Sequence, residues 1–196
     1  HISIKTKIHS VLHLLNSSMF LMIFLVAVLS IPMLYIKNEY AHLKSYFYMM
    51  SFFVISSVIF FICYWYMFKK SYGGGLKSFF KYTGTFFTFF SIAMGFSLHN
   101  SIAVLEGHFG KKSDFIRTPK FNIKTLQDSW RKNKYITKKP SINILTEGVL
   151  TLYFAFGMYS AFVVGDTGGD FGLFPFHLML FFGFGYVFYT SIFTKS

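Results

Sequence analysis

The chain has 196 residues, of which 54% are apolar, 22% are aromatic and only 13% are charged. Soluble domains carry about 25% charged residues, so this chain lacks the polar side chains that would cover a globule of its size. The composition excludes a soluble domain, a disordered segment and a disulfide scaffold, and it favours an all-α membrane protein. Lys and Arg number 19 against seven Asp and Glu, for a formal net charge of +12. Because cytoplasmic loops of membrane proteins are rich in Lys and Arg, the placement of these charges predicts topology.

Residues 1–17 are predicted to form an amphipathic helix in the membrane interface. Ile4 and Ile8 recur at helical spacing on one face, and Lys5 and Lys7 lie elsewhere around the helix. The chain begins with His1 and shows no cleavable signal pattern, so we expect a piece of a longer protein.

Residues 18–68 are predicted to contain two transmembrane helices. The segments 18–36 and 45–68 carry no charge, and each is long enough to cross a hydrocarbon core of about 30 Å. Cys63, the only cysteine, lies inside the second segment, which excludes an intrachain disulfide and argues against a Cys-based metal site.

Residues 69–105 are predicted to form a linker followed by an interfacial or re-entrant element at the cytoplasmic face. Gly73, Gly74 and Gly75 interrupt the chain after the second span. The 28 residues of 78–105 are too few for two spans of about 20 residues each.

Residues 106–141 form a long basic loop, and residues 142–196 contain two more predicted spans. Ten of the 19 Lys and Arg fall in this loop. If 78–105 does not cross the membrane, 17 of the 19 lie on the cytoplasmic side; if it crosses once, only six do. Charge placement therefore predicts about four transmembrane helices and two amphipathic interface or re-entrant elements at the cytoplasmic face.

The basic loop has two interpretations from its residues alone. Its cations, hydroxyls and aromatic rings suit a phosphate-bearing ligand, with Phe115 able to stack on a base or a sugar. The simpler interpretation, which composition favours, is that the cations fix orientation and contact anionic lipid headgroups.

The segment Phe115-Ile-Arg-Thr-Pro-Lys120 fits the pattern F-x-x-T-x-K. It resembles F-x-V-T-x-K, the gating loop of processive family 2 glycosyltransferases, which are cellulose synthase and its relatives. The order of elements is similar, with an interface helix and two spans before the motif and further spans after it. Together with the stretches 100–107 and 110–113, it looks like the bacterial branch of that superfamily.

The resemblance implies a function for the complete enzyme. A cytosolic catalytic domain, using a divalent metal, transfers sugar from a nucleotide-sugar donor to a growing β-linked polysaccharide, and the membrane helices carry the polymer outward. Residue by residue, it assigns Phe115, Thr118 and Lys120 to the nucleotide-binding gating loop. Arg117 stands where the family has Val and adds a potential phosphate contact. The implied location is the bacterial inner membrane, with an accessory subunit as a further candidate partner and no nucleic acid.

The catalytic motifs of that superfamily, including its Asp residues and its Q-x-x-R-W motif, are absent here. We therefore expect no catalytic residue, no bound cofactor and no sugar transfer by this chain alone. Glu147 lies about 7.5 Å into the third span by helical rise. It is either a channel-lining group or a residue that reaches water or pairs with Lys138 or Lys139.

Two other functions compete with a glycosyltransferase. One is a small polytopic transporter or membrane scaffold whose basic loop binds only lipid. The other, less favoured, is a redox protein that uses His9 and His13, four residues apart on one helix face; without a second His pair, we expect no metal site.

Overall fold

The computed structural model of the chain describes residues 3–111, 142–165 and 168–194, and every element in these ranges is a helix. In chain order they are α1 (Ile4–Glu39), η1 (Ala41–Leu43), α2 (Lys44–Met50), η2 (Ser51–Phe53), α3 (Val54–Tyr72), α4 (Leu76–Gly95), α5 (Ser97–His108), α6 (Ile142–Val163) and α7 (Phe174–Thr194). Four segments are long and apolar enough to cross a membrane: Ile4–Glu39, Ala41–Tyr72, Ile142–Val163 and Phe174–Phe193. The expected all-helical chain with several membrane-length helices is confirmed at this level.

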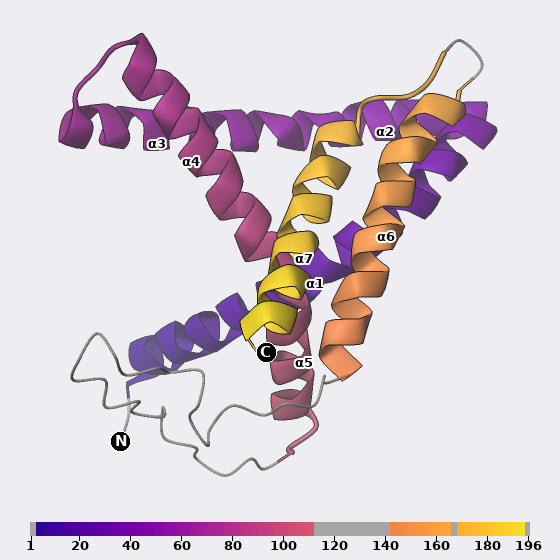
Figure 1. The fold of residues 1–196 in the computed structure, drawn as a ribbon. Coiled ribbons are helices and arrows are strands. Elements are labelled where there is room, and N and C mark those ends of the chain that lie inside the picture. The colour runs from indigo at the N-terminus through magenta and orange to yellow at the C-terminus, as the bar shows by residue number, and fades with distance from the viewer. Residues whose placement is uncertain (1–2, 112–141, 166–167, 195–196) are drawn as a thin grey trace.

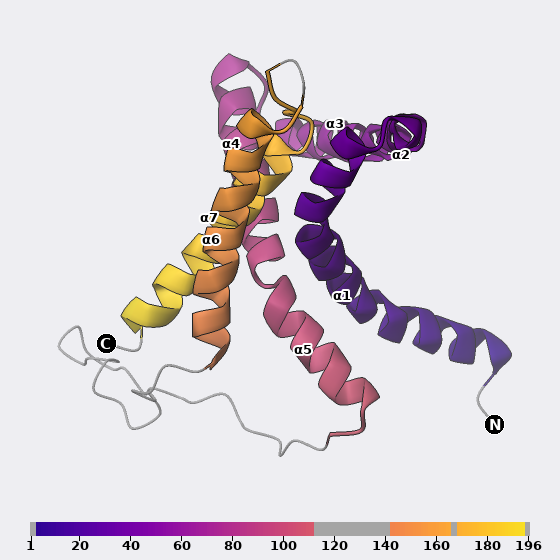
Figure 2. The same ribbon diagram turned by 90° about the vertical axis from the view of Figure 1, so that its right-hand side faces the viewer.

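The helices α1, α6 and α7 run between two ends of the molecule, while α3 runs crosswise at the level of the upper ends of α6 and α7 (Figure 1). The start of α1, the end of α5, the start of α6 and the end of α7 lie toward the opposite, lower end in both views (Figures 1 and 2). We call this lower end the loop end, because α5, which precedes residues 112–141, ends there and α6, which follows them, begins there.

Residues 69–105 contain α4 and α5, a pair bent by 40° that runs from the upper end to the loop end. A bent pair of this kind forms either one broken span or a re-entrant loop, so the predicted re-entrant element stays a prediction. Helix α4 packs along α7 and α5 packs along α1. Charge counting could not reveal this arrangement, since it depends on which helix surfaces fit together.

The predicted break between an interface helix over 1–17 and a separate first span is absent from α1, which is one helix from Ile4 to Glu39. Ser3 caps its start, accepting a hydrogen bond from the Thr6 amide at 3.2 Å. The Asn16-Ser17-Ser18 interruption does not end the helix, because each of these residues costs only tenths of a kcal/mol relative to Ala, about 0.5 on average.

Other predicted boundaries agree with the structure. The glycine break separates α3 from α4, with positive φ angles of 84° at Gly73 and 125° at Gly75. The third and fourth spans appear as α6 and α7. Helix α5 ends in a Schellman motif in which Gly110 adopts φ of 68° and the Lys111 amide donates to the Glu106 carbonyl at 3.0 Å.

The apolar core lies where α1, α5, α6 and α7 meet. Phe154 and Phe184 are fully buried, with ring centroids 5.3 Å apart. The buried cluster consists of Ala27, Ile31, Leu98, Leu150, Phe154, Leu180 and Phe184. It fixes the helices that carry the buried polar groups described below.

Candidate functional site

A carboxylate lies inside the bundle. Glu147 of α6 is fully buried, and its Oε1 pairs with Nε2 of His99 on α5. The His99 side chain remains 38% exposed, so the pair connects the interior to its surroundings. Burying a charge without a partner costs roughly several kcal/mol. Ionisable groups within membrane helices therefore usually pair, and they often mark functional sites.

The interior near the start of α5 has spare hydrogen-bonding capacity. Within the part of the chain that the structure describes, Glu147 Oε2 and the hydroxyls of Ser97 and Ser101 are buried without a hydrogen-bond partner. Buried polar atoms are nearly always paired with protein or water. These atoms therefore offer positions where water or a polar ligand can bind, around the helix that leads into the basic loop.

A second group of polar contacts lies between α1, α6 and α7. Ser30 Oγ lies 2.9 Å from Nε2 of the fully buried His177 and donates to the Ala27 carbonyl at 2.7 Å. The Tyr35 hydroxyl lies 3.0 Å from Ser160 Oγ. The bundle interior thus carries hydrogen-bonding groups at two levels of α6, separated by the apolar core.

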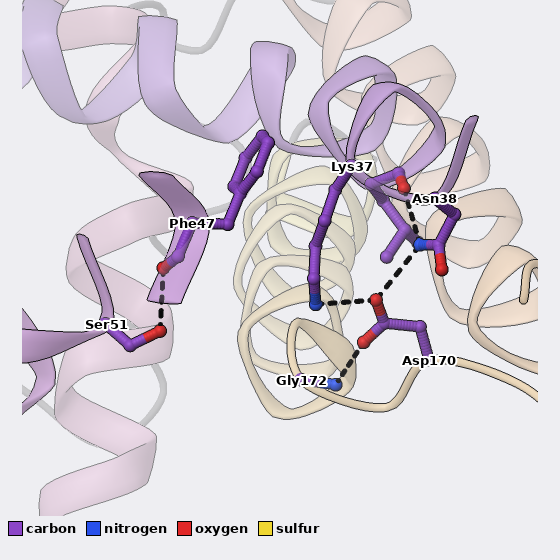
Figure 3. Close-up of polar contacts among 7 residues, drawn as sticks. Lys37, Asn38, Phe47, Ser51, Asp170 and Gly172 are labelled. Carbon is purple, nitrogen blue, oxygen red and sulfur yellow. Dashed lines mark hydrogen bonds and ion pairs between the residues drawn. The ribbon is translucent and has the colours of Figure 1, made fainter. Parts of the chain in front are cut away.

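At the upper end, Asp170 links the α6–α7 connection to the end of α1 (Figure 3). Its Oδ2 accepts hydrogen bonds from Lys37 Nζ at 2.7 Å and Asn38 Nδ2 at 3.0 Å, and its Oδ1 accepts from the Gly172 amide at 3.1 Å. Burial acts most strongly, raising the pKa of the Asp170 carboxyl, but the Lys37, Asn38 and Gly172 contacts together hold that pKa below its ordinary value of 3.8.

The residues predicted for the gating loop, Phe115, Arg117, Thr118 and Lys120, lie outside the described residues. So do Lys138 and Lys139, the cations considered as partners for Glu147. Within the described ranges, Glu147 pairs with a histidine instead, and no group of three or more metal-ligating side chains comes together.

The sequence indicated part of this site but did not predict which residues pair within it. Glu147 stood out as an ionisable residue in an apolar span, but 48 positions separate it from His99 and no spacing rule joins the two. The contact of Ser30 with His177 spans 147 positions. Such pairs depend on how the helices pack, which a single sequence does not reveal.

No protein-family model, curated protein or solved structure matches this chain.

Proposed function

We propose that this chain is the membrane-channel and gating-loop portion of a processive glycosyltransferase of the cellulose synthase-like superfamily. The complete enzyme would extend a β-linked polysaccharide from a nucleotide-sugar and pass it through the bacterial inner membrane. The observation that carries the proposal is the F-x-x-T-x-K segment from Phe115 to Lys120 in the most basic stretch of the chain.

The position of the flanking helices supports this proposal. The segment is preceded by α5 and followed by α6, which His99 and Glu147 tie together inside the bundle. Helix α5 ends and α6 begins at the loop end, where α1 also begins (Figure 2). A gating loop in this segment would therefore be anchored by two helices that are joined by the contact between His99 and Glu147.

The polar groups in the bundle interior support the proposed passage of a polysaccharide. A polysaccharide presents hydroxyl groups along its length, and its passage requires donors and acceptors inside an otherwise apolar bundle. Glu147, Ser97 and Ser101 carry unsatisfied polar atoms in the described interior.

The test uses the full-length natural protein purified from its own membranes and supplied with radiolabelled UDP- and GDP-sugars. We expect incorporation into a polymer, and we expect Lys120→Ala to lower turnover by about tenfold or more, as expected when one charged contact to a phosphate is lost. Lys124→Ala removes a cation from the same loop outside the motif and is the control. Equal turnover of the two variants would remove the gating role.

A proton-linked transporter is the second candidate, and the α4–α5 bend favours it. Broken helices beside buried ionisable groups are typical of transporter binding sites, and His99 lies just after the bend. In proteoliposomes, solute uptake driven by a pH gradient and abolished by Glu147→Gln, with no sugar incorporation by the full-length protein, would select this candidate.

A further inference from the structure

A groove separates the first half of α1 from α5. The two helices diverge toward the loop end (Figure 2), and the space between them has a volume of about 690 Å³. Small-ligand sites typically measure about 300–1,000 Å³. Its apolar lining comes from Val11, Leu15 and Phe20 of α1 and from Ala103, Val104 and Gly107 of α5.

Polar groups line the same groove. Ser17, Ser18, Asn100 and His108 contribute to its walls. The His108 ring folds over the end of α5, with Nδ1 3.0 Å from the Val104 carbonyl oxygen. The groove thus combines an apolar wall with hydrogen-bonding groups.

The charge around the groove is positive at the loop end. Lys7 lies one helical turn before Val11 on the same face of α1, and it is exposed. Helix α1 carries no acidic residue before Glu39, at its far end. On α5, Glu106 is paired with Lys111, so its charge is already compensated.

We propose that this groove binds an anionic glycerophospholipid. One acyl chain lies along the apolar wall, and the phosphate lies near Lys7 at the loop end. A phospholipid suits the groove because it supplies a long apolar chain for Val11 and Val104 together with a negative group for the cation. A neutral lipid would leave that cation uncompensated. This site is independent of the basic loop and of the proposed function.

The test is native mass spectrometry of the chain released from nanodiscs that contain phosphatidylcholine and phosphatidylglycerol in equal amounts. We expect wild type to retain phosphatidylglycerol preferentially. Ala103→Trp fills the groove, and Lys7→Gln removes the cation; each should lower retained phosphatidylglycerol by about fivefold, the equivalent of one Lys contact near an anionic surface.

The controls change the same helices away from the groove. Lys5→Gln removes a cation two positions earlier, on another face of α1, and Leu105→Trp enlarges a side chain that is already 39% exposed. Both should retain phosphatidylglycerol like wild type, and circular dichroism checks the helix content of every variant. Equal retention of both lipids by wild type, or equal losses in the controls and the groove variants, would mean annular lipid only and would overturn the proposal.

Discussion

Gly95 of α4 and Gly183 of α7 meet backbone to backbone. A Cβ built on Gly95 would lie 2.3 Å from the Gly183 carbonyl oxygen, and one built on Gly183 would lie 1.9 Å from the Ser91 carbonyl oxygen. Small residues let membrane helices approach this closely, and their packing then replaces the hydrophobic driving force that lipid does not supply. Because Gly95 is the last residue of α4, this contact also fixes the point from which α5 departs.

Gly183→Ala is predicted to destabilise the chain by about 1–3 kcal/mol, the usual cost of overpacking, because backbone atoms must move to admit the methyl group. Equilibrium unfolding in mixed micelles measures the change. Gly84→Ala is the matched control on α4, since nothing lies within 4 Å of a Cβ at that position. For Gly84→Ala we expect the free energy of unfolding to rise by up to about 1 kcal/mol, because alanine has a higher helix propensity than glycine. A Gly183→Ala protein as stable as wild type would show that the two helices separate without cost.

His99→Ala is predicted to lower the free energy of unfolding by about 3 kcal/mol, the low end of the range for breaking a buried pair, because His99 is partly exposed. The change leaves the carboxylate of Glu147 buried without its partner. Adding Glu147→Leu should recover most of the loss, since a well-packed apolar side chain then replaces the charge. The same unfolding experiment measures the single and double variants.

The control for that pair is Glu106→Gln, which breaks the exposed contact between Glu106 and Lys111. Exposed ion pairs contribute about 0–1 kcal/mol, so this variant should unfold almost like wild type. If His99→Ala and Glu106→Gln have equal effects, the buried pair does not stabilise the α5–α6 contact.

Acid is predicted to weaken the contact between α1 and the α6–α7 connection. The pKa of Asp170 is lowered in the folded chain, so its carboxylate stabilises the fold above the unfolded pKa near 3.8, and this contribution is lost as pH falls through the lower folded value. In thermal unfolding at a series of pH values, Asp170→Asn should lose this acid-dependent part of the melting temperature. Glu39→Gln, which changes the last residue of α1, should keep it.

The sequence predicted the elements better than their arrangement. Apolar length alone predicted two spans in residues 142–196, where α6 and α7 lie, and the glycines marked the α3–α4 break. The Gly95–Gly183 contact is different, because nothing in either apolar run distinguishes a glycine that touches another helix from one, such as Gly84, that touches nothing. For the same reason, the sequence could not predict that His99 pairs with Glu147 or that Ser30 contacts His177.

Cysteine labelling distinguishes the two layouts of residues 69–105. The charge-based prediction puts Lys77 and Ser113 on one side of the membrane. In the structure, the first turn of α4, which contains Lys77, lies at the upper end, whereas α5 ends at the loop end (Figure 1). Of the 19 Lys and Arg, 13 lie in residues 1–17, in residues 106–141 or after the last span, which are the segments that join helices at their loop-end termini, and six lie in 37–44 and 69–81. The positive-inside rule therefore still makes the loop end cytoplasmic.

We therefore expect an impermeant maleimide to label Lys77→Cys but not Ser113→Cys in intact cells, in a Cys63→Ser background. Cys63 must be replaced because it is exposed on α3. After the cells are permeabilised, both positions should react, which controls for expression and thiol access. Protection of both positions in intact cells would mean that 45–68 crosses the membrane and 78–105 does not. Labelling of Ser113→Cys from outside would reverse the orientation and remove the nucleotide-binding role proposed for Lys120, because nucleotide-sugars are cytosolic donors in the proposed reaction.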